Sequence, residues 1–212
     1  MKQSNGLLRH DIRDTSMYRD ITRGKLDLMV LRHMARRLHL TLHQLEEPAS
    51  AQPLLYKLQE RHGRIHRIVI YKYQELLLKR SLNFVGFISG KQKHIHASVV
   101  DAIQMIDRRL VQELVHIPGI LSYSSLELRN GDWCNLVLLS DTDAKRQLKN
   151  TETHTYAAHE LANHYYEWIR LHNGIMPHGL DHTEMILQKT RRYTFHLEPS
   201  RPTVRELSYG VC

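Results

Sequence analysis

Two apolar runs joined by a tight-turn dipeptide constrain the fold of this chain more than any other feature. The segment ILSYSSLELRNGDWCNLVLLSD, residues 120–141, places Asn130 and Gly131 between these runs. An Asn-Gly pair tolerates the positive φ angles that a tight hairpin turn requires. The two runs therefore predict a pair of adjacent antiparallel strands.

Further strands and a helix are predicted on the N-terminal side of this hairpin. RIHRIVIYKY (64–73) and SLNFVGFISG (81–90) carry the β-branched and aromatic residues that are typical of strands. QELLLKR, between them, fits either a helix or a strand. A helix that ends before Pro118-Gly119 is indicated by apolar residues three and four positions apart, Val99, Ile103, Ile106, Leu110 and Leu114.

On the C-terminal side the sequence predicts one long helix and one more strand. The helix is expected from about Asp143 to His172, where glycines and a proline follow. MILQKTRRYTFHL, residues 185–197, predicts the last strand. The tail from residue 198 to residue 212 holds two prolines and is expected to be coil.

The N-terminal part of the chain predicts a helical extension. Residues 1 to about 20 are polar and are expected to form a loose arm. From Lys25 to Leu45, apolar residues recur at helical spacing and indicate an amphipathic helix. LLYKLQERHG, residues 54–63, predicts a second short helix that Gly63 closes.

Taken in order, residues from about Ser81 to Leu197 predict strand, helix, strand, strand, helix, strand. This βαββαβ order is typical of a ferredoxin-like α+β unit, in which both helices pack on one face of an antiparallel sheet. The other face needs a cover. We expect a second copy of the chain to cover this face in a homodimer, which would close an α+β barrel. The alternatives are that the strand near Ile68 or the N-terminal helices cover it.

The expected domain division is 1–63 for the N-terminal arm and helical extension, 64–198 for the ferredoxin-like barrel domain, and 199–212 for the tail. Hydrophobic residues make up 42% of the 212 residues and charged residues 25%, which is typical of a soluble globular protein. No apolar run reaches the roughly 18 residues of a membrane span. The N-terminus is too polar for a secretory signal, so a cytoplasmic protein is expected.

Charge and cysteine content narrow the classes of function. Cys134 and Cys212 do not form a disulfide framework or a metal motif. The net charge of +8 suggests a nucleic-acid partner. However, the basic clusters, Arg32 to Arg37 and Arg191-Arg192, lie in no recognisable nucleic-acid module. A solvated basic face or a pocket for an anionic ligand is expected instead.

Four histidines, His154, His159, His164 and His172, lie in the stretch from residue 150 to residue 172. If the stretch is one helix, His154 and His172 fall within about 40° of Leu161 on a helical wheel, and His164 lies about 60° to one side. His159 points to the far side. The four imidazoles therefore cannot form one ligand cluster on this helix alone.

The spacing of these histidines argues against a zinc-protease motif. HELANH is one residue longer than HExxH, so His159 and His164 point roughly 140° apart. A zinc site of His154 with partners elsewhere stays open, although no cysteine or carboxylate cluster has ligand spacing. Heme needs only one proximal imidazole, an apolar slot and cationic groups for its propionates. The alternative is that these histidines are structural or surface residues.

The segment from Pro118 to Glu160 resembles the antibiotic biosynthesis monooxygenase superfamily of dimeric α+β barrels. The resemblance covers about half of the chain and lies in pattern more than identity. It rests on Pro118-Gly119 before a strand, the Asn130-Gly131 hairpin, the turn Ser140-Asp141, and Thr151 followed by His154.

In the heme-degrading branch of that superfamily, the resemblance implies a proximal histidine on the second helix after an alanine. Ala158-His159 lies near this place but is offset by about one position, whereas His154 fits the wheel better. Asn83 would correspond to an asparagine on the first strand. The tryptophan expected early in the second helix is missing, since Gln147, Leu148 and Lys149 stand there.

The leading prediction is a heme-binding, monooxygenase-like enzyme that acts on a small molecule as a homodimer. His154 or His159 would be the iron ligand, His164 and Trp168 would line the heme site, and Asn83 and Tyr165 would assist catalysis. The first alternative is a cofactor-free oxygenase or cyclase of a biosynthetic pathway, as in other branches of the superfamily, with Tyr165, Tyr123 and His154 around the substrate. A histidine suits proton transfer near neutrality. The second alternative is a non-catalytic ligand-binding or interaction protein.

Overall fold

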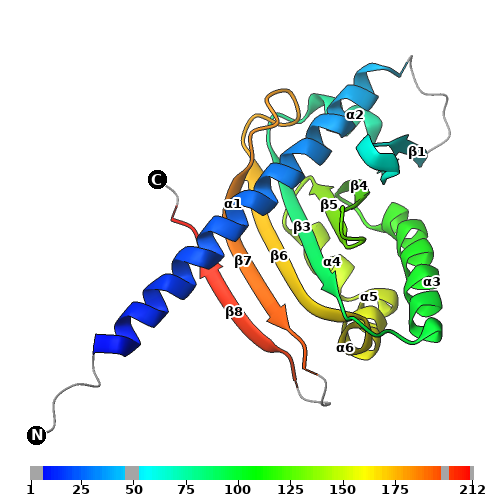
Figure 1. The fold of residues 1–212 in the computed structure, drawn as a ribbon. Helices are drawn as coiled ribbons and strands as arrows, with labels where there is room; N and C mark the ends of the chain where they lie inside the picture. Colours follow the sequence, from blue (N-terminus) through cyan, green and yellow to red (C-terminus); the bar gives the residue numbers. More distant parts are fainter. Residues whose placement is uncertain (1–6, 46–52, 197–200, 211–212) are drawn as a thin grey trace, which may run out of the picture.

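Eight antiparallel strands form one sheet, in the order β1-β2-β4-β5-β3-β6-β7-β8, with helices on both faces (Figure 1). The computed structural model describes residues 7–45, 53–196 and 201–210, and side chains from residue 18 onward. The strands are β1 (Leu54–Gln59), β2 (Ile65–Ile70), β3 (Leu82–Lys91), β4 (Ile120–Glu127), β5 (Trp133–Leu139), β6 (Tyr166–Met176), β7 (Ile186–Thr194) and β8 (Thr203–Ser208). The helices are α1 (Leu7–His43), α2 (Tyr73–Leu78), α3 (Ala97–Glu113), α4 (Asp143–Lys149), α5 (Glu152–Tyr156) and α6 (Ala162–Tyr165), and a π-helical turn, η3 (Ala157–Leu161), joins α5 to α6.

The predicted βαββαβ unit is present at the centre of the sheet. β3, α3, β4, β5, the α4–α6 segment and β6 follow one another along the chain, and their strands lie in the order β4-β5-β3-β6. This is the strand order of a split βαβ arrangement. β1 and β2 extend the sheet beyond β4, and β7 and β8 extend it beyond β6.

The predicted hairpin is confirmed, with a difference in its turn. β4 pairs with β5 in antiparallel register, from Tyr123 opposite Val137 to Glu127 opposite Trp133. Of the dipeptide, only Gly131 has a positive φ, of 77°. Its amide donates to the carbonyl of Leu128 at 3.0 Å. A glycine with positive φ closing a slightly longer loop is a common hairpin geometry.

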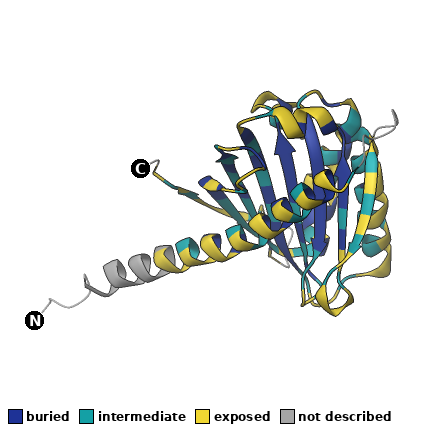
Figure 2. Cartoon of the chain, turned by 90° about the horizontal axis from the view of Figure 1, so that it is seen from above, coloured by how far each residue is buried: buried dark blue, intermediate teal, exposed yellow. Residues whose placement is uncertain are grey.

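α1 covers one face of the sheet, called the α1 face here (Figures 1 and 2). Its buried side chains recur at three and four residues, as expected for an amphipathic helix. The apolar ones are Leu31, Met34, Ala35, Leu38 and Leu42, each at most 1% exposed. Gly86 on β3 permits the close approach, because a Cβ there would lie 2.5 Å from Leu31 Cδ1.

α3 and the α4–α6 segment cover the opposite face, called the α3 face. Because side chains alternate along a strand, Val69, Tyr123 and Val137 point to this face while their neighbours point to α1. Leu110 and Leu114 pack against them. The sheet therefore lies between two helical layers, with a separate apolar core on each side.

Three secondary-structure predictions are wrong. Residues 54–59, predicted as helix, form β1, whose burial alternates along the strand. Residues 166–172, predicted as the end of the long helix, belong to β6. Residues 203–208, predicted as coil, form β8 on the sheet edge. The sequence-based division thus placed β1 in the N-terminal extension and β8 in the C-terminal tail. In the structure β1 pairs with β2 and β8 pairs with β7.

The predictions at the N-terminus are partly confirmed. The helix expected from Lys25 is present, but it begins at Leu7, within the stretch expected to be a loose arm. QELLLKR, which fitted two structures, supplies the end of α2. The segment EPASAQP, residues 47–53, which the sequence predicts as a loop between the two N-terminal helices, lies mainly outside the described residues.

The dimeric barrel is not confirmed, because α1 covers the α1 face within one chain. This is one of the alternatives that the sequence left open. A homodimer that pairs two α1 faces would have to displace the helix and its buried leucines. Among the helices described, none has the length and apolar character needed to cross a membrane.

Candidate functional site

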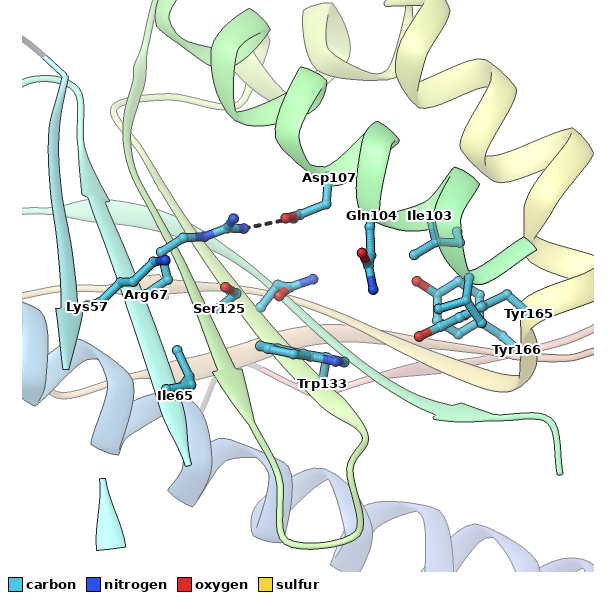
Figure 3. Close-up of a pocket in the computed structure, with 12 residues that line it drawn as sticks. Lys57, Ile65, Arg67, Ile103, Gln104, Asp107, Ser125, Trp133, Tyr165 and Tyr166 are labelled. Atoms are coloured by element: carbon cyan, nitrogen blue, oxygen red, sulfur yellow. Dashed lines mark hydrogen bonds and ion pairs between the residues drawn. The ribbon is translucent and has the colours of Figure 1, made fainter. Parts of the chain in front are cut away.

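A cavity of about 330 Å³ lies between α3 and the α3 face of the sheet (Figure 3). Ligand pockets for small molecules begin at roughly this volume. Strands β1, β2, β4 and β5 form its floor, and α3 with the end of α6 forms its wall. The polar and aromatic lining residues are Lys57, Arg67, Gln104, Asp107, Ser125, Trp133, Asn135, Tyr165 and Tyr166.

Strand register brings the floor residues together. Arg67 on β2 is paired with Ser125 on β4, and Ser125 is paired with Asn135 on β5. These three side chains therefore form a row across the sheet. Trp133 lies two residues before Asn135 and so points to the same face.

An ion pair joins the floor of the cavity to its wall. Arg67 Nη2 donates to Asp107 Oδ1 at 2.8 Å, and the hydroxyl of Tyr123 donates to the same oxygen at 3.1 Å. Burial tends to lower the pKa of Arg67, but the hydrogen bond to Asp107, the charge of Asp107 and the neighbouring Tyr123 together outweigh it, and the pKa is raised. Arg67 is therefore a fixed cation. Its Nε is buried and has no hydrogen-bond partner in the part of the chain that is described.

Three aromatic side chains line the other end of the cavity. The rings of Tyr165 and Tyr166 meet edge to face with centroids 4.8 Å apart, and Trp133 lies on the floor (Figure 3). Burial raises the pKa of both tyrosines, and Asp132 raises that of Tyr165 further. Both phenols are thus protonated near neutrality and can donate hydrogen bonds.

A glutamine fixes the position of this tyrosine pair. The side-chain Nε2 of Gln92 donates to the carbonyl of Asn163 at 2.7 Å, and the backbone N–H of Gln92 donates to the carbonyl of Tyr165 at 3.0 Å. The end of α6 is therefore tied to the segment that follows β3. This restricts the movement of the cavity wall.

The predicted histidine ligands do not come together. His154 on α5 is half-buried, while His159 on η3 and His164 on α6 are exposed. The π-helical turn shifts the phase of the helix between His154 and His164, so the helical wheel does not hold across it. Burial lowers the pKa of His154, and Lys149 lowers it further. None of these three lines the cavity among the residues described.

Tyr165 is the one predicted site residue that lines the cavity. Asn83 is half-buried on β3, opposite Leu139 and Ile175. Trp168 is on β6, where the guanidinium of Arg170 lies 4.1 Å from the centre of its ring. A catalytic role for any of these residues stays a prediction.

His172, expected on the surface in one interpretation, is fully buried under α1. Its Nε2 lies 2.9 Å from Asp27 Oδ2 and its Nδ1 lies 2.8 Å from the hydroxyl of Thr190. Arg170 forms a bidentate ion pair with Asp27, at 2.5 and 2.8 Å. This cluster fastens α1 to β6, so His172 has a structural environment.

Sequence reasoning missed the polar pair of the cavity, although one signal was present. Asp107 lies four residues after Ile103 and three before Leu110, within the stripe that marks the apolar face of α3. A carboxylate in that stripe needs a buried partner. The partner, Arg67, could not be identified because the strand pairing was unknown.

Comparisons with known proteins add a weak likeness of fold. No family model matches the sequence, and no curated protein matches it. One similar solved chain is a variant of SnoaB, a cofactor-independent oxygenase from Streptomyces nogalater. It has 15% identity and a TM-score of 0.33, with 46% of this chain and 92% of that chain covered. Another is PA3566 from Pseudomonas aeruginosa, with 15% identity and a TM-score of 0.36, covering 45% and 93%.

The prediction of heme is corrected. The similar oxygenase is described as cofactor-independent. The proposed iron ligands, His154 and His159, lie on different turns of an irregular helix and do not face the cavity between α3 and the sheet. An axial imidazole must point into the slot that holds the macrocycle. No role of heme is therefore proposed.

Proposed function

We propose that this chain is a cofactor-free oxygenase, similar to members of the antibiotic biosynthesis monooxygenase superfamily, that acts on a phenolic small molecule. The observation that carries the proposal is a cavity with aromatic side chains at one end and the Arg67–Asp107 ion pair at the other. Such a cavity fits a planar ring with a hydroxyl or an anionic oxygen. Of the three residues that the sequence-based alternative placed around the substrate, Tyr165 lines this cavity, whereas Tyr123 and His154 are not among its lining residues.

The unpartnered Nε of Arg67 supports an oxygen-bearing ligand. A buried donor without an acceptor costs roughly 1–3 kcal/mol. A phenolate oxygen in the cavity would accept from it and would gain the stabilisation of a fixed cation. Planar rings pack favourably against Trp133, Tyr165 and Tyr166, because aromatic rings attract one another edge to face or in offset stacks.

In this proposal Asp107 accepts a proton from the substrate and Arg67 stabilises the resulting anion. An activated CH₂ group flanked by phenolic rings is a suitable reacting centre. Its carbanion gives one electron to O₂, and the two radicals then combine to form a C–O bond. Loss of water from the hydroperoxide breaks the O–O bond and leaves a ketone. The balance is one CH₂ and one O₂ to one C=O and one H₂O, so the substrate is the only reductant.

The first prediction concerns oxygen uptake with a dihydroxyanthrone as the probe. Wild-type protein treated with a chelator is expected to consume O₂ faster than the buffer does. Asp107→Asn is expected to lower that rate about 100-fold or more, because positioned acid–base groups typically contribute this much. The measurement is made with an oxygen electrode, and the quinone product is followed by absorbance.

Asp101→Asn is the matched control, since Asp101 is an exposed carboxylate on the same helix that does not line the cavity. Its rate should equal that of the wild type. Equal rates in the wild type, Asp107→Asn and buffer would contradict the oxygenase. If the probe still bound under those conditions, a non-catalytic binding protein would be the better account.

A further inference from the structure

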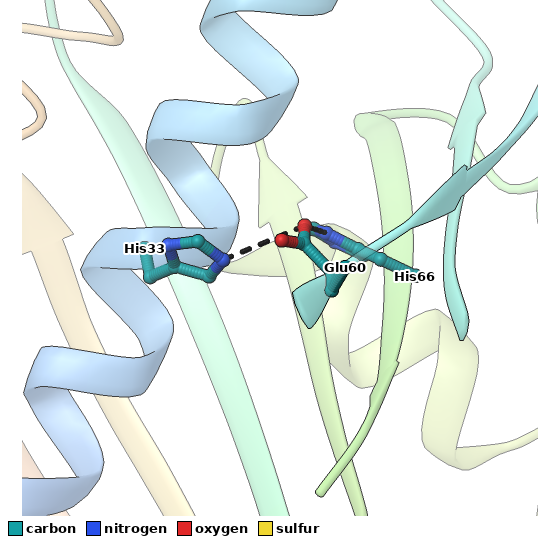
Figure 4. Close-up of side chains that lie close together, drawn as sticks. All are labelled: His33, Glu60 and His66. Atoms are coloured by element: carbon teal, nitrogen blue, oxygen red, sulfur yellow. Dashed lines mark hydrogen bonds and ion pairs between the residues drawn. The ribbon is translucent and has the colours of Figure 1, made fainter. Parts of the chain in front are cut away.

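We infer that His33, Glu60 and His66 form a binding site for a divalent transition-metal ion, with zinc as the best match. The three side chains converge between α1 and the β1–β2 hairpin (Figure 4). Among the residues described, none of the three lines the cavity between α3 and the sheet. Each offers one ligand atom, and the three atoms lie within 4.8 Å of one another. Two imidazoles and one carboxylate are ligands that suit zinc, and three protein ligands leave a fourth position for water or another small ligand.

The distances fit a tetrahedral ion. Glu60 Oε1 lies 3.5 Å from His33 Nε2 and 3.1 Å from His66 Nδ1. Zinc bonds to nitrogen and oxygen are about 2.0–2.1 Å long, so two ligands of a tetrahedral ion lie about 3.3 Å apart. The two distances to Glu60 Oε1 are therefore within a few tenths of an ångström of this value, and the two imidazole nitrogens lie no more than 4.8 Å apart.

Each ligand comes from a different element, and all three elements are fixed by packing. His33 lies on α1 between the buried Leu31 and Met34, His66 lies on β2, and Glu60 follows β1. The backbone of Glu60 is held by a hydrogen bond from its amide to the carbonyl of Arg64, at 2.9 Å. A metal ion here would clamp α1 to the β1–β2 hairpin.

The three side chains differ in exposure, so the site is closed on one side and open to solvent on the other. The side chain of His66 is fully buried and that of Glu60 is 10% exposed, whereas that of His33 is 46% exposed. An ion can therefore enter past His33. Water can also reach the fourth ligand position from that side.

Arg37 opposes the ion and makes the inference testable. Its Nε donates to Glu60 Oε1 at 3.0 Å, the same oxygen that faces both imidazoles. A bound cation must share that oxygen with the guanidinium or displace it. The Arg37 side chain is 32% exposed, so it can turn toward solvent. Removing its charge should therefore tighten metal binding.

A second cluster of possible metal ligands must be removed by substitution before metal binding is measured. His39, His43 and Asp181 also bring their ligand atoms within 4.8 Å of one another. His43 and Asp181 are exposed, and the two histidines are four residues apart on α1. The double variant His39→Gln/His43→Gln is therefore the background for every measurement, so that a second ion is not counted.

The experiment is a calorimetric titration of the chelator-treated full-length background variant with zinc chloride, followed by a melting curve. One zinc ion per chain and a higher melting temperature are expected. His33→Gln and Glu60→Gln should each weaken binding at least 10-fold, while Arg37→Gln should strengthen it. His94→Gln, at an exposed histidine outside the site, is the control and should change nothing. Cobalt(II) should give the visible spectrum of a tetrahedral ion in the background variant and in the His94→Gln control, but not in His33→Gln or Glu60→Gln.

The competing account is that Glu60 only joins the side chains of His33, Arg37 and His66 and so holds α1 in place. That account predicts no zinc binding in the background variant, and loss of stability without metal binding in Arg37→Gln. Equal zinc affinity in the background, His33→Gln and Glu60→Gln would also overturn the inference. His33 is exposed on a helix, so His33→Gln tests the site even if variants of His66 fail to fold.

Discussion

Asp107 shows how one side chain can indicate a site when it breaks a pattern. The apolar stripe of α3 would be continuous without it, and the cavity would then have no carboxylate. Arg67 lies on the same face of β2 as Val69, so alternation along the strand points it toward α3. The two residues are 40 positions apart, and the β2–β4 pairing together with the packing of α3 on the sheet brings them into contact.

Gly174 is a residue at which the packing leaves no room for a side chain. A Cβ there would lie 2.1 Å from the backbone oxygen of Ile186 and 2.6 Å from the ring of Phe84. Gly174→Ala is therefore expected to lower the free energy of unfolding by about 1–3 kcal/mol, the usual cost of overpacking. Urea denaturation measures the change. Gly210→Ala is the control and should have no effect, because a Cβ at Gly210 meets nothing within 4 Å. If Gly174→Ala left the free energy of unfolding unchanged, β6 and β7 would have to lie farther apart.

At the scale of elements, the docking of α1 depends on a buried charge cluster as well as on apolar contacts. Asp27 is 7% exposed and receives hydrogen bonds from Arg170 and His172 on β6. Thr190 and Tyr209 extend the cluster to β7 and to the residue after β8. One carboxylate on α1 thus connects the helix to the last three strands.

Replacing Asp27 tests this connection. Asp27→Asn keeps the size of the side chain but leaves the guanidinium of Arg170 buried without its counter-ion. Removing one partner of a buried ion pair typically costs about 3–5 kcal/mol, so a loss of that order is expected at pH 7. Asp20→Asn is the control, because Asp20 lies 3.6 Å from Arg192 in a more exposed ion pair. Such pairs contribute about 0–1 kcal/mol.

The loss of stability in Asp27→Asn is expected to depend on pH. Burial tends to raise the pKa of Asp27, but hydrogen bonds from His172 and Arg170 outweigh it and the pKa falls below its ordinary value of 3.8. A depressed carboxyl pKa contributes stability that is present above about pH 4 and is lost as the pH falls through the lower folded value. The stability difference between the wild type and Asp27→Asn should therefore shrink below pH 4. A difference that is constant from pH 7 to pH 3 would contradict the ion pair.

At the scale of the whole molecule, the sequence predicted the central unit better than its additions. The hairpin, β3 and α3 each combine an unambiguous period with a clear stop, and all three are confirmed. β1 alternates Leu54, Tyr56 and Leu58 inward, a period-two signal that its leucines and the following Gly63 obscured. β8 is stable only because β7 supplies a partner, and pairing of that kind cannot be read from a local pattern.

The prediction for the histidine-rich stretch, residues 150–172, was wrong for a different physical reason. A single helical wheel was applied from residue 150 to residue 172, but the segment contains a π-helical turn and then becomes β6 at Tyr166. Each change resets the direction in which side chains point. His172 therefore faces α1, while Tyr165 faces the cavity. The candidate site depended on these directions, and most of it could not be predicted.

α1 and the cavity lie on opposite faces of the sheet. The helix covers the α1 face, whereas the cavity with its aromatic end lies on the α3 face, under α3 and α6 (Figure 3). A single chain therefore has a complete cavity. A homodimer would have to use a surface other than the α1 face, which the buried side chains of the helix already occupy.

The most direct test of the central claim, that this cavity binds a phenolic ring, is an NMR titration of the two tryptophan side chains. Trp133 lines the cavity, and Trp168 lies elsewhere on the sheet beside Arg170. Their indole N–H signals are assigned with Trp133→Phe and Trp168→Phe, and a dihydroxyanthraquinone is then added. The account predicts a saturable shift of the Trp133 signal alone. A shift of the Trp168 signal alone, or no shift of either, would contradict it.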